Sequence, residues 1–204
     1  MSMLNIKLNT KSKWLVFFLL LFSDPVLAKL IYVKGQLGMS VTTDGSIDGT
    51  DVNTKLAAPY PITLGLGVYV TSVSSLALEL NYETTKIDEL PPSITAIGSD
   101  TQTQVSAMLS YYYHTPKLFI LEPFVGAGAG YTQLKIQKND FEGESFTWQA
   151  TVGTDISYSD SLQFVIEGRV FKPVDIQLTD ENNVDVGEFN TTQIKLLAGI
   201  KLKF

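Results

Sequence analysis

His114 is the only histidine in the chain, so it decides which catalytic centres the sequence could build. A Ser-His-acid centre uses an imidazole as its general base, and a histidine-rich metal site needs more than one. His114 stands in the stretch SYYYHTPK, directly before Thr115 and Pro116, which indicate a tight turn. We therefore expect an interfacial polar side chain where a strand meets a turn. We predict that the chain has no catalytic residues and is not an enzyme.

Two further motifs could bind a phosphate or a metal ion. The stretch GAGAG at 126–130 lacks the Lys-Ser/Thr pair and the following helix of a phosphate-binding loop. The stretch DGSIDGTD at 44–51 brings together Asp44, Asp48 and Asp51, and carboxylates of this kind bind calcium. Their spacing is not that of an EF-hand, so we favour a solvated acidic loop and keep calcium as the alternative. No cofactor is predicted.

Five charged residues stand beside apolar neighbours: Lys34, Glu79, Glu167, Arg169 and Lys201. Both signs are present, so these side chains could form ion pairs if the fold brings them together. What they can do depends on the elements that carry them.

Those elements are eight segments in which apolar and polar residues alternate, and alternation of this kind is typical of β-strands. Almost no stretch after residue 28 has helical periodicity. The eight segments are 31–41, 62–71, 76–83, 104–113, 123–131, 146–156, 162–170 and 194–204. The fold class predicted is therefore all-β, as one eight-stranded antiparallel up-and-down barrel without an appended domain.

The connections between these segments alternate in length. Short links lie around 73–75, 115–117 and 159–161, whereas the long and polar connections cover about 42–61, 87–101, 137–144 and 178–191. A membrane β-barrel has short turns at one end and long loops at the other. A soluble sandwich has no reason to separate its loops in this way. The pattern therefore favours a transmembrane barrel.

The N-terminus has the features of a cleaved signal peptide. Three lysines precede an apolar run at 14–22, which is too short to span a bilayer, and a small-residue cleavage site follows at 26–28. We predict a signal peptide at 1–28 and one domain at 29–204. Cleavage removes three lysines and Asp24, so the net charge changes from −6 to −8. An acidic exported chain does not suit nucleic-acid binding.

Three stretches resemble the small eight-stranded outer-membrane barrels of OmpA/OmpX type: LEPFVGAGAGY at 121–131, LQFVIEGRVF at 162–171 and LLAGIKLKF at 196–204. The resemblance covers essentially all of 29–204 and implies a Gram-negative outer membrane as the location. It also implies that the last strand, ending at Phe204, is read by the barrel-assembly machinery. We expect a monomer surrounded by phospholipid and lipopolysaccharide, with both termini in the periplasm.

In such a barrel the apolar face meets lipid and the polar face fills the lumen. The five charged residues are then predicted to form a paired plug, and re-pairing among them to gate a narrow ion path is the alternative. We expect a structural, surface-exposed role, with long loops acting as an adhesin, antigen or host-interaction surface. A soluble lipocalin-like barrel that binds a small ligand is a further alternative. The loop residues that give this surface its negative charge are Asp44, Asp48, Asp51, Asp180, Glu181, Asp185 and Glu188.

Overall fold

The computed structural model describes residues 31–47, 50–51, 59–87, 100–136, 141–174, 176–179 and 185–204. The predicted signal peptide at 1–28 lies outside these residues. Within them, no helix is long and apolar enough to cross a membrane. The strands are β1 Ile31–Ile47, β2 Thr50–Asp51, β3 Ile62–Thr71, β4 Ser74–Ile87, β5 Asp100–His114, β6 Leu121–Ile136, β7 Phe141–Ser157, β8 Leu162–Pro173, β9 Ile176–Thr179 and β10 Asp185–Lys203.

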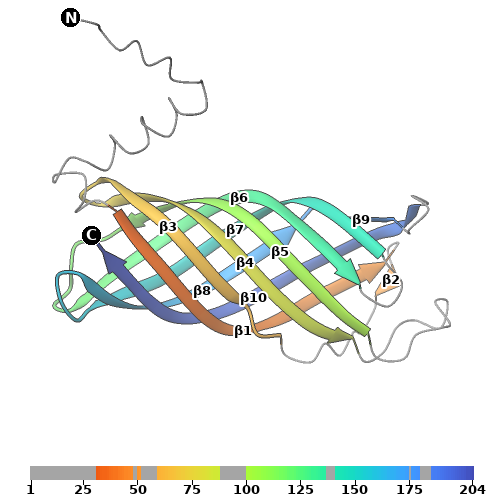
Figure 1. Cartoon of the computed structure of the whole chain (residues 1–204), viewed down its shortest axis with the longest axis horizontal. Coiled ribbons are helices and arrows are strands. Elements are labelled where there is room, and N and C mark those ends of the chain that lie inside the picture. The colour runs from red at the N-terminus through yellow and green to blue at the C-terminus, as the bar shows by residue number, and fades with distance from the viewer. Residues whose placement is uncertain are drawn as a thin grey trace, which may run out of the picture.

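Eight of these strands form a closed antiparallel barrel (Figure 1). Each long strand pairs with its neighbour in sequence, and the sheet closes where β1 pairs with β10, from Tyr32 opposite Lys203 to Ile47 opposite Phe189. The short strand β2 pairs with the end of β1, and β9 continues β8, since it pairs with both β7 and β10. Closure matters because an open edge in hydrocarbon would leave N–H and C=O groups without partners. The predicted eight-stranded barrel is confirmed.

The two ends of the barrel differ as the connection lengths predicted. The short turns between β3 and β4, β5 and β6, and β7 and β8 lie at one end, which we call the turn end. The first and last described residues lie there too, since the Phe204 amide donates to the Ile31 carbonyl at 2.9 Å. In Figure 1 the C-terminus marks this end, and β2 and β9 mark the opposite end.

Several strands run further toward the long-connection end than the alternation predicted. β1 continues to Ile47 rather than ending near residue 41, and β10 begins at Asp185 rather than near residue 194. β7 likewise begins at Phe141. Beyond the lipid boundary both faces of a strand can be polar, so backbone pairing continues where the apolar periodicity has stopped.

The two faces of the sheet have opposite character. On β3, Leu64 is 59% exposed whereas its neighbour Thr63 is 1% exposed. The same alternation holds along β8. Large apolar side chains therefore point outward to lipid, and polar side chains point into the lumen. The soluble lipocalin-like alternative needs the apolar face inside and is therefore wrong.

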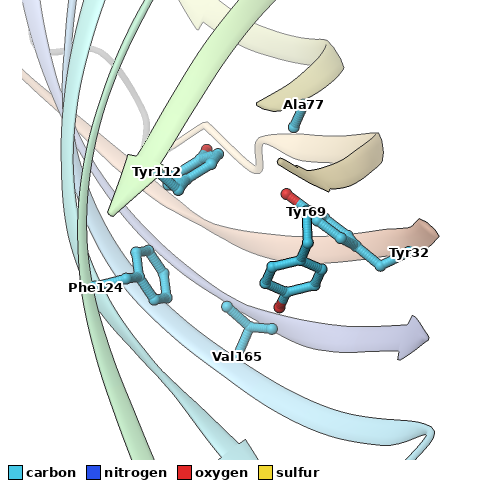
Figure 2. Packing of buried hydrophobic residues seen from close by; sticks show 6 residues of the cluster. All are labelled: Tyr32, Tyr69, Ala77, Tyr112, Phe124 and Val165. Carbon is cyan, nitrogen blue, oxygen red and sulfur yellow. The ribbon is translucent and has the colours of Figure 1, made fainter. Parts of the chain in front are cut away.

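Near the turn end, aromatic side chains fill the lumen (Figure 2). The rings of Tyr32 and Tyr69 lie 5.4 Å apart, and those of Tyr112 and Phe124 meet edge to face at 5.6 Å. These rings come from four different strands and point toward the barrel axis. The interior here is packed with side chains.

Glycines on β6 provide the space for this packing. A Cβ atom on Gly126 would lie 2.5 Å from the Tyr112 ring, and one on Gly128 would lie 2.5 Å from the Ser110 hydroxyl. Real Cβ atoms do not approach that closely. The GAGAG stretch therefore leaves room for inward side chains from β5, as expected of small residues on the inner face of a narrow barrel.

Candidate functional site

The candidate site is a group of four charged side chains in the middle of the lumen. β1 supplies Lys34, β4 supplies Glu79, and β8 supplies Glu167 and Arg169. All four occupy inward positions of their strands and are at most 2% exposed. We call these four residues the charge cluster.

The strand register explains how Lys34 and Glu79 meet across an intervening strand. Gly65 on β3 is the register partner of both Lys34 and Glu79. A Cβ atom at Gly65 would already touch Lys34 Cε at 3.5 Å and Glu79 Cγ at 3.6 Å. Because Gly65 has no side chain, the two long side chains can reach each other in front of it.

Every cation of the charge cluster contacts both carboxylates. Lys34 Nζ lies 2.7 Å from Glu79 Oε1 and 3.2 Å from Glu167 Oε2. Arg169 Nη2 lies 3.5 Å from Glu79 Oε1 and also forms an ion pair with Glu167 Oε1. Two positive and two negative groups cancel in formal charge. Burying charge is costly unless it is paired in this way.

Neutral hydrogen-bond donors occupy the remaining acceptor sites of the Glu79 carboxylate. The Tyr112 hydroxyl donates to Oε1 at 2.7 Å, while the Ser110 hydroxyl and the Gln149 amide donate to Oε2 at 2.9 Å and 2.8 Å. Arg169 Nη1 in turn donates to Asn81 Oδ1 at 2.9 Å. The charge cluster is therefore the centre of a polar network that crosses the lumen.

Lys201, the fifth predicted residue, lies apart from the other four. It forms its ion pair with Asp155 of β7, and its ammonium lies 4.9 Å from the centre of the Tyr32 ring. A further buried pair joins Lys195 to Glu83 at 2.5 Å toward the other end. The partners Asp155, Glu83 and Lys195 are not among the predicted site residues. Their only signal is an inward position in the alternation.

His114 is buried inside the barrel, so the prediction of an interfacial side chain is wrong. β5 extends as far as His114, which has the same inward parity as Tyr112 and is 2% exposed. His114 Nε2 lies 3.2 Å from the Ser75 hydroxyl. Its Nδ1 lies 3.7 Å from Glu122 Oε1 and 3.8 Å from Asp155 Oδ2. This grouping of serine, histidine and acid was not predicted, because its members come from four strands.

The sequence from residue 15 to residue 199 matches the family described as outer membrane protein beta-barrel domain. The chain belongs to this family. It is an integral barrel of a Gram-negative outer membrane, which agrees with the resemblance to the small outer-membrane barrels. No curated protein matches the chain.

Solved structures of outer-membrane barrels share this fold. Neisserial surface protein A is 15% identical with a TM-score of 0.62, over 85% of this chain and 97% of that chain. OprG from Pseudomonas aeruginosa is 13% identical with a TM-score of 0.57, over 87% and 96%. AlkL, determined in DMPC lipid bilayers, is 17% identical with a TM-score of 0.54, over 89% and 93%. At these identities the likeness concerns the fold alone.

In this outer-membrane barrel, the grouping around His114 is poorly suited to nucleophilic catalysis. Ser75 is completely buried, and the Tyr32 hydroxyl contacts its Oγ at 3.2 Å. The distances from His114 Nδ1 to the two carboxylates exceed hydrogen-bond length, so no acid orients the imidazole. A substrate would have to displace the surrounding rings to reach the hydroxyl.

The lumen of the barrel is also filled above and below the charge cluster. Toward the turn end, the gap among Tyr32, Tyr112, His114 and Phe124 is too small for a water molecule. Toward the other end, Leu134, Phe171 and Ile176 are at most 1% exposed. In the part of the chain that the structure describes, no group of His, Asp and Glu side chains could hold a metal ion. The side chains of Asp44, Asp48 and Asp51 lie outside that part.

Proposed function

We propose that this outer-membrane barrel acts at its outer surface, through its long connections, and that it neither conducts through its lumen nor catalyses a reaction. The filled lumen carries this proposal. Charged groups from β1, β4 and β8 pair across the axis, and aromatic or apolar side chains occupy the levels on either side. Eight strands enclose little more space than their own side chains need.

The proposed orientation places the turn end and both termini in the periplasm. The long connections then face the outside, within the lipopolysaccharide layer. The closing strand β10 ends at Lys203, and the next residue, Phe204, is 59% exposed. We propose that the assembly machinery reads this end of the chain. We propose a monomer, because closure of β1 on β10 leaves no unpaired edge between the long strands for a second copy.

The charge of the long connections suggests the chemistry of a partner. In each of the four segments 42–61, 87–101, 137–144 and 178–191, acidic residues outnumber lysines. The last of them contains Asp180, Glu181, Asp185 and Glu188 and no lysine. A surface of one sign attracts partners of the opposite sign and speeds their association. We therefore propose a host or surface ligand with a basic patch.

Cell adhesion tests this role directly. Bacteria that express the barrel are allowed to settle on polylysine-coated and polyglutamate-coated glass, beside bacteria that express a barrel with the four acidic residues of 178–191 changed to Asn or Gln. Compared with bacteria that lack the barrel, bacteria that express it should be retained several-fold more on polylysine. The neutralised variant should lose most of that gain. Equal retention on polylysine of bacteria with the unchanged barrel and bacteria with the neutralised variant, at equal surface expression, would contradict the proposal.

A narrow ion channel is the second candidate, and it would require the charge cluster to exchange partners. Lys34 and Arg169 each lie within 3.5 Å of a Glu79 oxygen and also contact Glu167, so more than one pairing is possible without long movements. If re-pairing gates a path, Arg169→Ala should increase conductance in planar bilayers. Lys135→Ala, which removes an exposed ion pair with Glu142, is the matched control. An unchanged trace for Arg169→Ala counts against the channel.

A further inference from the structure

The turn between β5 and β6 is the apolar exception among the short turns. Its residues Leu118, Phe119 and Ile120 are 65%, 96% and 46% exposed. By contrast, the turn after β7 carries Ser159, Asp160 and Ser161. Short turns that face water have no need of large apolar side chains, so three in a row require an explanation.

The backbone of this turn does not supply that explanation. Leu118 and Leu121 exchange two hydrogen bonds of 2.8 Å and 3.1 Å, which leaves Phe119 and Ile120 as a two-residue hairpin loop. Phe119 has a φ of 63°. Glycine or asparagine suits a hairpin position with positive φ, whereas a bulky aromatic residue is uncommon there. Turn formation therefore does not account for the phenylalanine, and its side chain needs another role.

The exposed side chains of the turn are continuous with the lipid-facing surface of the barrel. Leu121 occupies an outward position of β6, and the Ser157 amide donates to the Ile120 carbonyl at 2.9 Å, so the sheet extends to the turn. Tyr158 is 76% exposed, and its ring lies 6.1 Å from that of Phe164 on the outward face of β8. We call Leu118, Phe119, Ile120, Leu121 and Tyr158 the turn patch.

We propose that the turn patch inserts into the phospholipid leaflet at the turn end and anchors that side of the barrel rim. Phe119 enters the acyl-chain boundary, and Tyr158 lies at the headgroup level, where amphipathic rings are favoured. Lys117 stands beside the patch with its side chain 56% exposed and its ammonium 3.9 Å from Glu122 Oε2, and a lipid phosphate is a further partner for it. With the proposed orientation this is the periplasmic leaflet. The insertion itself does not depend on any partner of the long connections.

Tryptophan fluorescence tests the insertion in the full barrel. The mature chain with Trp148→Phe lacks tryptophan, so Phe119→Trp and, in a second protein, Leu118→Trp provide single reporters. Ser159→Trp in the polar turn after β7 is the matched control. Each protein is refolded into phosphatidylcholine vesicles with or without bromine on the acyl chains, and acrylamide probes access from water.

Insertion predicts that Phe119→Trp and Leu118→Trp emit at shorter wavelength than Ser159→Trp. Brominated lipid should quench them at least twofold, and acrylamide should quench them weakly. If both reporters match Ser159→Trp in emission and in acrylamide quenching, the turn patch lies in water and the proposal is overturned. The proposal is also overturned if brominated lipid has no effect and the blue shift disappears when the protein-to-lipid ratio is lowered. In that case a second copy of the barrel, and not lipid, covers the turn patch.

Discussion

Removal of the Arg169 guanidinium should destabilise the barrel strongly, because the charge cluster balances charges that have no access to water. In Arg169→Met, two carboxylates would share the single ammonium of Lys34. Glu79 would keep its hydrogen bonds from Tyr112, Ser110 and Gln149. Glu167 would keep an ion pair with Lys34 at 3.2 Å but lose its pair with the guanidinium.

Removing one partner of a buried ion pair lowers the free energy of unfolding by about 3–5 kcal/mol. The neutral donors around Glu79 favour the lower end of that range, so we expect the free energy of unfolding of Arg169→Met to fall by about 3 kcal/mol. Lys135→Met is the matched control, because it removes an ion pair whose side chains are 52% and 49% exposed. Exposed pairs contribute about 0–1 kcal/mol.

Urea titration of barrels refolded in lipid vesicles measures both changes, with the folded fraction read from heat-modifiable gel mobility. Glu167→Gln and the double variant Arg169→Met/Glu167→Gln complete a cycle. The double variant restores a neutral charge cluster. Its loss in free energy of unfolding should therefore be smaller than the sum of the two single losses by about 1–3 kcal/mol. If Arg169→Met lowers the free energy of unfolding no more than Lys135→Met, or if the losses in the cycle are additive, the guanidinium does not balance buried charge in the lumen.

Three further predictions concern other parts of the barrel. Gly130→Ala should lower the yield of folded, heat-modifiable barrel severalfold, since its Cβ would lie 2.0 Å from a backbone carbonyl of β5, whereas Gly168→Ala should fold normally because the nearest atom is 4.0 Å away. Equal yields of the two variants would contradict this packing. Deletion of Phe204 should reduce insertion into the membrane far more than it reduces the urea resistance of inserted barrels, and an unchanged insertion yield would remove the assembly role. Ser75 should not react with a fluorophosphonate probe in the folded barrel, because it is completely buried, and labelling that Ser75→Ala abolishes would point to an active hydrolase.

The strand count and the assignment of faces could be predicted from the sequence because lipid imposes a strict period of two. Leu64 must meet hydrocarbon and Thr63 must not, so the two faces differ in composition along every spanning segment. That constraint ends at the lipid boundary. The parts of β1 beyond Val41 and of β10 before Ile194 pair through their backbones with no apolar periodicity, so their strand character was missed.

The sequence showed which charged residues point inward, but not which of them meet. Contacts across the lumen depend on the tilt of the strands and the stagger of their register, and no short sequence pattern encodes either. Lys201 therefore lies beside Asp155, and Lys34 reaches Glu79 across Gly65, the register partner of both. The inward position of His114 was not predicted for a different reason: Pro116 indicates a turn, yet β5 continues through His114.

Thiol accessibility tests the filled lumen most directly, and the absence of cysteine from the chain makes every introduced thiol unique. Ser110→Cys places a thiol in the middle of the lumen, Leu109→Cys places one on the lipid face, and Ser72→Cys places one in an exposed turn. The barrels are refolded in vesicles and treated with a charged, water-soluble thiol reagent. We predict rapid reaction at Ser72→Cys and no reaction at Ser110→Cys or Leu109→Cys until the barrel is unfolded by boiling. Reaction of folded Ser110→Cys at a rate close to that of Ser72→Cys would show a water-filled lumen and contradict the account.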